Sequence, residues 1–267
     1  MKASFLSLLL TCLMLCWLTS CQNRSKTNAA WAKTDKLFEF KGHEDWTASW
    51  MLDGLRSKVI SSEKGMELIA GPEPKNDTCH TVLWTQQSFA GNICIEYDYT
   101  RTDTTTRYVN ILYFLATGEG SAEYPTDIAR WNEKRIVPHM RTYFRHMNTY
   151  HISYAAITEQ GARDYIRLRR YDPSQERLKG TDIPEDYFQT GLFKPEVTYH
   201  IEVCKYGDQL EMHIQNKGNA SDVLVCQWDI TGYPPCTSGR IGFRHMYTRS
   251  ARYKDIKVWR LEAKAGG

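Results

Sequence analysis

The chain alternates apolar and polar positions in short segments, which is the pattern of half-buried β-strands. These segments are rich in Ile, Val, Tyr and Thr, and Gly, Pro, Asn and Asp separate them. We predict strands at 93–99, 108–115, 150–157, 164–171, 199–206, 210–215, 223–230, 240–246 and 253–261. Many short antiparallel strands with polar turns between them predict a sandwich of two sheets or a jelly roll.

One connection is much longer than the rest. Residues 117–149 carry Pro125, Pro138 and several charges, and the stretch 127–134 is compatible with a short helix. Long ordered loops in compact domains are usually functional. We therefore expect this connection to border the functional site.

The N-terminus has the pattern of an export signal. Lys2 precedes the apolar stretch 5–17, which is too short to span a bilayer comfortably. The sequence Leu-Thr-Ser-Cys at 18–21 resembles a bacterial lipobox, in which the cysteine is lipidated. An ordinary signal peptide followed by a chance cysteine is the alternative.

The lipobox interpretation sets the expected boundaries and location. We predict a lipoprotein signal peptide at 1–20, a lipidated tether at 21–36 that starts at Cys21, and a single β-sandwich domain at 37–262. The protein would contact a membrane through its lipid anchor only. The polar tether carries no acidic run, which favours an outer-membrane lipoprotein that faces the periplasm.

Composition narrows the class of protein. The 267 residues include 34 Lys and Arg against 31 Asp and Glu, and 42% are hydrophobic, which is a globular composition. The Lys and Arg residues do not gather in one run, so we expect no nucleic-acid partner. Beyond Cys21, five cysteines remain in an exported chain, and we expect them to be buried with one disulfide bridge.

Polar and aromatic residues at alternate positions, whose side chains would lie on the same face of a strand, mark a candidate binding face. In a sandwich strand one face packs on the other sheet and the alternate face is free. His80 and Trp84 share one face of their segment, His151 and Ser153 share one face of theirs, and Arg244 points away from its apolar neighbours. The same reasoning adds further candidates for ligand contacts: Arg145, Asn148 and Met246.

Three segments carry a resemblance to a known family. They are 80–84 (HTVLW), 148–154 (NTYHISY) and 239–246 (GRIGFRHM), and they resemble the signature segments of the YesU-like family. The similarity extends over about 37–261. The resemblance implies a concanavalin A-like β-jelly-roll sandwich and a role among proteins that degrade acidic polysaccharides such as rhamnogalacturonan and ulvan.

The candidate residues suit β-elimination on a uronic-acid sugar, by a lyase or a dehydratase. Arg145, Asn148 and Arg244 would neutralise the sugar carboxylate. His151 or His80 would act as the base, and Tyr143 or Tyr150 as the acid. Trp84, Ser153 and Met246 would complete the contacts with the acidic oligosaccharide or polysaccharide.

Two other functions stay open. The same face could bind carbohydrate without catalysis, because Tyr and Trp stack on sugar rings. Hydrolysis ranks third, since Glu96 and Asp98 lie two residues apart on one predicted strand and need not flank a glycosidic bond. We predict no cofactor and assign no metal ligand, because no dense Asp/Asn loop marks a calcium site.

Overall fold

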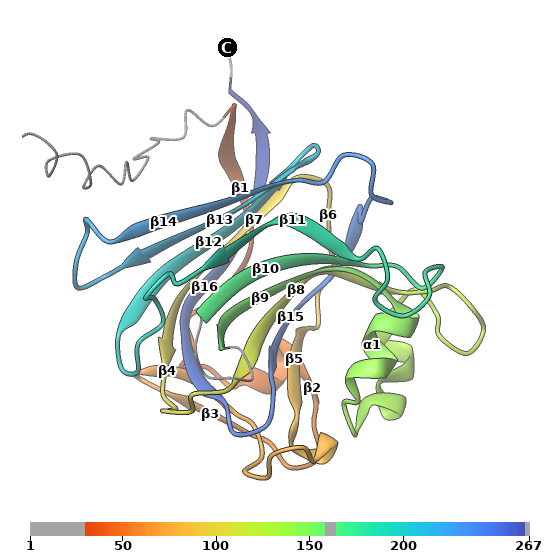
Figure 1. The fold of residues 1–267 in the computed structure, drawn as a ribbon, viewed down its shortest axis with the longest axis horizontal. Coiled ribbons are helices and arrows are strands. Elements are labelled where there is room, and N and C mark those ends of the chain that lie inside the picture. Colours follow the sequence, from red (N-terminus) through yellow and green to blue (C-terminus); the bar gives the residue numbers. More distant parts are fainter. Residues whose placement is uncertain (1–29, 158–163, 265–267) are drawn as a thin grey trace, which may run out of the picture.

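Two antiparallel sheets of eight strands each form the protein, and they pack face to face (Figure 1). The computed structural model describes residues 30–157 and 164–264. The predicted signal peptide, Cys21 and the first part of the tether lie outside these residues, so the lipid anchor and the location stay predictions.

Sheet A has the order β14-β13-β12-β7-β16-β4-β3, with β1 paired to β16. Its strands are β1 (Trp31–Phe40), β3 (Lys58–Ser62), β4 (Gly65–Ile69), β7 (Ile93–Arg101), β12 (Thr198–Tyr206), β13 (Gln209–Asn216), β14 (Val223–Asp229) and β16 (Ser250–Ala263). β1 begins inside the predicted tether, because its residues pair with the end of β16. The ordered domain therefore starts before residue 37.

Sheet B has the order β11-β10-β9-β8-β15-β5-β2, with β6 paired to β15. Its strands are β2 (Trp50–Asp53), β5 (Thr81–Thr85), β6 (Phe89–Ala90), β8 (Tyr108–Gly118), β9 (Met147–Ile157), β10 (Asp164–Tyr171), β11 (Asp182–Phe188) and β15 (Ser238–His245). The predicted all-β jelly roll of two antiparallel sheets is confirmed.

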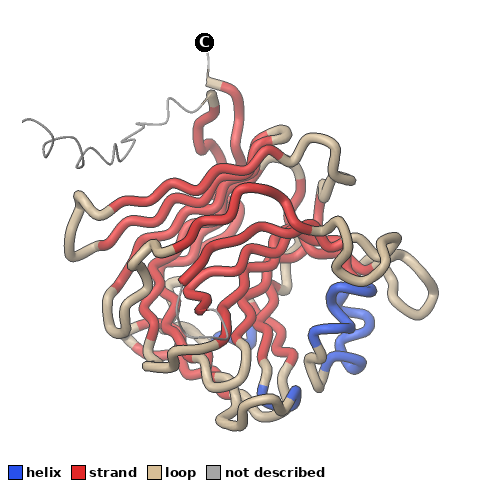
Figure 2. The backbone as a smooth tube through the Cα atoms, viewed as in Figure 1, coloured by secondary structure: helices blue, strands red, loops and turns tan. Residues whose placement is uncertain are grey.

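The long connection between β8 and β9 forms two helical segments. η3 (Ile128–Arg135) is a 3-10 helix near the predicted position, and α1 (Met140–His146) is a helix that the sequence did not indicate. Figure 2 shows both, in blue, on one side of the molecule. They pack on the outer face of sheet B, where α1 contacts β9 and β10 and η3 contacts β2 and β8. Two short 3-10 turns, η1 (Trp46–Ala48) and η2 (Asp77–Cys79), complete the helical content of the described residues.

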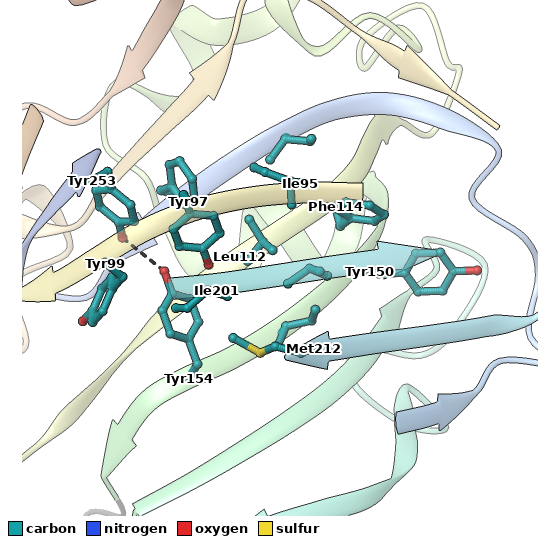
Figure 3. Packing of buried hydrophobic residues seen from close by; sticks show 14 of the residues in the cluster. Ile95, Tyr97, Tyr99, Leu112, Phe114, Tyr150, Tyr154, Ile201, Met212 and Tyr253 are labelled. Atoms are coloured by element: carbon teal, nitrogen blue, oxygen red, sulfur yellow. Dashed lines mark hydrogen bonds between the residues drawn. The ribbon is translucent and has the colours of Figure 1, made fainter. Parts of the chain in front are cut away.

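The core between the sheets is rich in tyrosine (Figure 3). Tyr97, Tyr99, Tyr154 and Tyr253 are buried there together, and the hydroxyls of Tyr154 and Tyr253 lie 3.2 Å apart. His245 places its Nε2 atom 2.7 Å from the Tyr253 hydroxyl. Buried hydroxyls are tolerated where they find such partners.

The cysteines follow the expectation of one bridge. Cys94 on β7 and Cys204 on β12 are paired positions of neighbouring strands, and they form a disulfide. Cys79, Cys226 and Cys236 are free and buried.

Candidate functional site

The outer face of sheet B brings the sequence-predicted polar residues together. Strand register places Tyr113 of β8 opposite His151 of β9, and Arg244 of β15 opposite Ile111 of β8. Ile111 in turn pairs with Ser153. Side chains of equal parity share a face, so Arg244, His151 and Ser153 project to the same side of the sheet.

The connection 119–146, which we call the cover, closes part of this face. Trp131 of η3 and Tyr143 of α1 are buried in one apolar cluster with Trp84 and Tyr113 of the sheet. Trp84, Tyr113 and Tyr143 are fully buried. Burial of these large rings against one another favours the closed arrangement.

The three rings form a parallel stack. The centroids of Trp84 and Tyr113 lie 5.3 Å apart, and those of Tyr113 and Tyr143 lie 5.6 Å apart. Gly242 makes room for the stack, because a Cβ atom at this position would meet the Trp84 ring at 2.5 Å. The expectation that Trp84 contacts substrate is therefore not supported by its position, since its ring is sealed beneath the cover.

One carboxylate fastens the cover to the sheet. Oδ2 of Asp53, at the end of β2, accepts hydrogen bonds from Arg135 Nε at 2.6 Å, Trp84 Nε1 at 2.7 Å and the Tyr143 hydroxyl at 2.8 Å. Asp53 and Arg135 are both fully buried. Burial raises the pKa of Asp53, and the charge of Arg135 opposes that rise. Because the Tyr143 hydroxyl already donates a hydrogen bond to Asp53, it is poorly placed to protonate a leaving group.

Arg244 is the second fully buried arginine of this region, and it lacks a carboxylate partner in the described part of the chain. Its Nη2 atom donates to Nδ1 of His80 and to the carbonyl oxygen of Pro138, both at 2.7 Å. Its guanidinium lies over the Tyr143 ring, with the central carbon 4.6 Å from the ring centroid. Nε and Nη1 of Arg244 make no hydrogen bond of good geometry, and the guanidinium also interacts with the neutral Tyr113 hydroxyl.

His80 adds a further unused donor beside Arg244. Nδ1 of His80 lies 2.7 Å from Arg244 Nη2 and 3.3 Å from the carbonyl oxygen of Pro138. Since arginine can only donate, the shorter contact makes Nδ1 an acceptor and puts the ring proton on Nε2. That Nε2 atom is buried and has no partner. Burial, followed by the nearby charge of Arg244, lowers the pKa of His80 to about 3. A ring in this state is a hydrogen-bond donor and a very weak base.

His151 is held in a chain of hydrogen bonds. Its Nδ1 atom is bonded to the Tyr171 hydroxyl, and its Nε2 atom lies 2.9 Å from Oγ of Ser153. Burial lowers the pKa of His151 well below its usual range, and the charges of Arg169, Arg244 and other guanidinium groups act in the same direction. His151 is therefore neutral at ordinary pH.

Two aromatic residues, Tyr247 and Tyr108, lie between His80 and the surface. The Tyr247 ring stacks on His80 with a centroid distance of 4.7 Å, and Tyr108 meets Tyr247 edge-on at 4.4 Å. Both tyrosines are half-buried. Among the cations of the same sheet, Arg167 is also half-buried and is paired with Asp186.

Three predicted site residues lie elsewhere, and a fourth, Met246, follows the end of β15. Tyr150 faces the inter-sheet core, and its hydroxyl accepts a long hydrogen bond from the Cys236 amide (Figure 3). The side-chain oxygen of Asn148 accepts a hydrogen bond from Arg170 on the same inner side of β9 as Tyr150. Arg145 is exposed on α1, and Met246 is half-buried just after β15. The structure thus removes Tyr150, Asn148 and Arg145 from the cluster, because neighbouring positions on a strand face opposite sides and because α1 turns Arg145 to solvent.

Sequence reasoning missed several members of the cluster. Asp53 and Arg135 come from a four-residue strand and from the cover, and neither shows a periodic pattern that would identify it. Tyr171 was visible as the last residue of a predicted strand, with the same parity as Arg167 and Arg169. Tyr247 follows the predicted strand 240–246 directly.

One group on the outer face of sheet A has metal-ligand chemistry. Donor atoms of Glu96, His200 and Glu202 lie within 4.8 Å of one another. The ammonium group of Lys33 contacts both carboxylates. The chain's own cation thus occupies this position.

None of the helices within residues 30–157 and 164–264 is both long enough and apolar enough to cross a bilayer. A comparison with curated proteins gives no match.

Comparison with solved structures identifies the fold. A protein of unknown function with a galectin-like fold from Bacillus subtilis aligns with a TM-score of 0.64 and 18% identity, over 88% of this chain and 100% of that one. A legume lectin-like domain from Entamoeba histolytica aligns with a TM-score of 0.56 and 8% identity, over 86% and 99%. The lumenal domain of VIP36 aligns with a TM-score of 0.54 and 10% identity, over 84% and 88%. At these identities the likeness shows the fold alone.

The sequence also matches a family defined by sequence, over residues 38–258. The match covers nearly all of both sheets, and the segments 80–84, 148–154 and 239–246 all fall inside it. The chain belongs to the family described as "Domain of unknown function (DUF1961)".

Proposed function

We propose that this protein binds an acidic carbohydrate on the outer face of sheet B, with Arg244 as the group that receives the ligand's carboxylate. The fold supports a carbohydrate ligand, since the similar VIP36 structure holds Man3GlcNAc and the similar lectin UEA-II holds galactose. The acidic character is inferred from this chain's own residues.

The observation that carries the proposal is the unsatisfied guanidinium of Arg244. A buried charge is costly unless it is paired and hydrogen-bonded. Nε and Nη1 of Arg244 and Nε2 of His80 are buried donors without an acceptor of good hydrogen-bond geometry, and the Tyr113 hydroxyl, which also interacts with Arg244, is neutral. A carboxylate supplies two acceptor oxygens and the missing negative charge, and arginine binds it through two parallel hydrogen bonds.

The electrostatics favour an anion over a neutral group. Asp53 is already paired with Arg135, so it does not compensate Arg244. Arg167 and Arg169 pair with Asp186 and Asp182 near the surface. Within the described cluster the charge of Arg244 is thus left over for a ligand.

Access requires movement of the groups that lie over Arg244. The side chain is fully buried, and the Tyr247 ring stacks on its partner His80. A ligand reaches the guanidinium only when the Tyr247 ring or the cover moves aside. We therefore expect association to be slower than for a preformed open groove.

Calorimetry with uronate oligosaccharides and neutral oligosaccharides of the same length tests this function. The protein should bind only the uronates, and Arg244→Met should weaken binding by about tenfold or more, since a hydrogen bond to a charged group is worth about 1.5–3 kcal/mol. Arg260→Gln is the matched control, because Arg260 is an exposed arginine that is ion-paired with Asp35. Equal binding of neutral and acidic ligands, or unchanged affinity in Arg244→Met, would refute the proposal.

Elimination chemistry is a second candidate, favoured by the Tyr171–His151–Ser153 chain. In this reaction a base removes the proton next to the sugar carboxylate, the carbon–oxygen bond on the adjacent carbon breaks, and an acid protonates the departing oxygen. His151 has the pKa of a very weak base in the free protein. An anionic substrate would offset the nearby guanidinium charges and raise that pKa.

The structure changes which residues this second candidate uses. His80 has its Nδ1 engaged by Arg244, Tyr143 is bonded to Asp53, and Tyr150 lies in the core. His151 as base with Tyr171 as acid is the pair that remains on the outer face of sheet B, and His151 can take a proton only after Tyr171 or Ser153 releases one of its ring nitrogens. Unsaturated products absorb in the ultraviolet, so a rise in absorbance with wild type that disappears in His151→Gln would support catalysis. Binding without any new product would support the binding function and exclude catalysis on that ligand.

A further inference from the structure

A cleft of about 610 Å³ lies on the outer face of sheet A, on the opposite side of the sandwich from Arg244. It lies where β16 passes β7 and β12, at Arg252, Thr100 and Thr198. Two turns contribute to its lining, one with Lys64 and one with Lys217. Ligand sites of this kind usually have volumes of about 300–1,000 Å³, so the cleft is large enough for a short oligosaccharide.

The lining of the cleft carries an excess of positive charge. Lys64, Lys217, Arg252 and Lys254 contribute cations, whereas only two lining residues are acidic, Asp98 and Glu196.

Both acidic groups of the lining already take part in ion pairs. Asp98 contacts Lys217 and His200, and Glu196 accepts from Arg252 at 2.8 Å. Two cations remain for a ligand. Lys254 bonds only to the carbonyl oxygen of Glu63, and the ammonium group of Lys64 has no partner among the described residues.

The polar walls suit a saccharide more than a simple ion. The hydroxyls of Thr100 and Thr198 lie 2.7 Å apart and either can donate, so the pair presents both donor and acceptor capacity. The amide of Asn216 lies in the same wall. None of the lining residues in the described chain is aromatic, so a neutral sugar would lack a stacking surface and charge must supply the affinity.

We propose that this cleft is a second carbohydrate site, which binds a saccharide unit that bears a carboxylate or sulfate group. Lys64 and Lys254 would contact the anionic group, and the threonine hydroxyls would contact sugar hydroxyls. The inference does not depend on Arg244, because the two sites lie on opposite sheets. Two sites on one chain would let a long polyanion be held at two points, which raises its apparent affinity above that of either site.

The cleft is far from the start of β1. Arg252 pairs with Thr100 at one end of β16, while Trp31 at the start of β1 pairs with Ala263 at the other end. At about 3.3 Å per residue this separation is on the order of 30 Å.

The test uses the full chain and four probes: digalacturonate, a sulfated disaccharide, lactose and inorganic sulfate. We expect the charged disaccharides to shift the amide resonances of Thr100, Thr198 and Gly218, and lactose to leave them unmoved. Lys64→Gln combined with Lys254→Gln should weaken this binding by about tenfold, since neither lysine belongs to an ion pair of the fold. Lys58→Gln combined with Lys179→Gln removes the same charge elsewhere on the surface and should bind as wild type.

The outcomes separate this site from the one on sheet B. Arg244→Met should leave the shifts at Thr100, Thr198 and Gly218 intact, so loss of the sheet B site does not imitate loss of this one. Unmoved resonances with both charged disaccharides would overturn the inference. Equal affinity for inorganic sulfate would also overturn it, because the cleft would then bind an anion without recognising the saccharide.

Discussion

At the scale of single residues, two buried arginines of the same region differ in one respect. Arg135 is paired with Asp53, whereas the partners of Arg244 are all neutral: an imidazole, a carbonyl oxygen and the Tyr113 hydroxyl. An unpaired buried charge lowers stability, and proteins retain such groups mainly at functional sites. The contrast between the two gives a direct test of whether Arg244 serves function.

Replacing each arginine with methionine should have opposite consequences. Arg244→Met removes an uncompensated charge and should change the free energy of unfolding by less than about 1 kcal/mol, or increase it. Arg135→Met strands the Asp53 carboxylate and should cost about 3–5 kcal/mol. Urea unfolding of the two variants measures both. A similar large loss in Arg244→Met would show that Arg244 is structural, contrary to the proposed function.

At the scale of elements, a single buried carboxylate oxygen joins three segments of the cover and sheet B. Asp53 on β2 receives donors from η3, α1 and β5 at once. The aromatic stack of Trp84, Tyr113 and Tyr143 adds apolar contact across the same boundary. The position of the cover therefore depends on a residue distant from it in sequence.

Asp53→Asn should loosen the cover. The substitution leaves Arg135 charged and unpaired in a sealed site, and we expect a loss of about 3–5 kcal/mol in the free energy of unfolding. Hydrogen exchange should become faster across 128–146. Asp127→Asn is the control: Asp127 pairs with Arg240 at the surface and caps η3, and asparagine caps equally well. Its expected cost is within about 1 kcal/mol, and an equal cost in the two variants would contradict the role given to Asp53.

At the scale of the whole molecule, buried histidines couple stability to pH. The pKa values of His80 and His245 are lowered to about 3, and that of His151 lies well below 6.5, with burial the main cause in each case. His200 behaves in the opposite way, because Asp98 and Glu202 raise its pKa to about 9. The two kinds of shift act on different sides of neutral pH.

We predict maximal stability near pH 6.5–7. A lowered folded pKa contributes stability above the unfolded value of about 6.5, and that contribution is lost as the pH falls below it. With three such histidines in the described chain, the free energy of unfolding should fall by up to about 4 kcal/mol per pH unit on the acid side. The raised pKa of His200 makes its contribution complete below about 6.5 and lost as the pH rises through about 9, which gives a gentler alkaline decline.

Urea unfolding at a series of pH values measures this profile. His245→Gln removes one of the three acid-titrating groups and should make the acid slope shallower by about one third. His245 lies in the inter-sheet core, so the variant leaves the proposed binding face untouched. Stability that stays constant between pH 7 and 5.5 would contradict the assignment of neutral buried histidines.

Local sequence pattern alone predicted nine of the sixteen strands in the described residues, the two-sheet fold and the parity that sets Arg244, His151 and Ser153 on one face. Period-two alternation reports burial directly, so these features follow from local pattern. It did not reveal Asp53 and Arg135, the α1 helix, the sealing of Trp84 or the cleft on sheet A. Those depend on which segments far apart in the chain come together, as Asp53 does with Arg135, or as Lys64 and Lys217 do in the lining of one cleft. Only the tertiary structure decides which charges are paired and which are left for a ligand, because pairing depends on distances that no local pattern encodes.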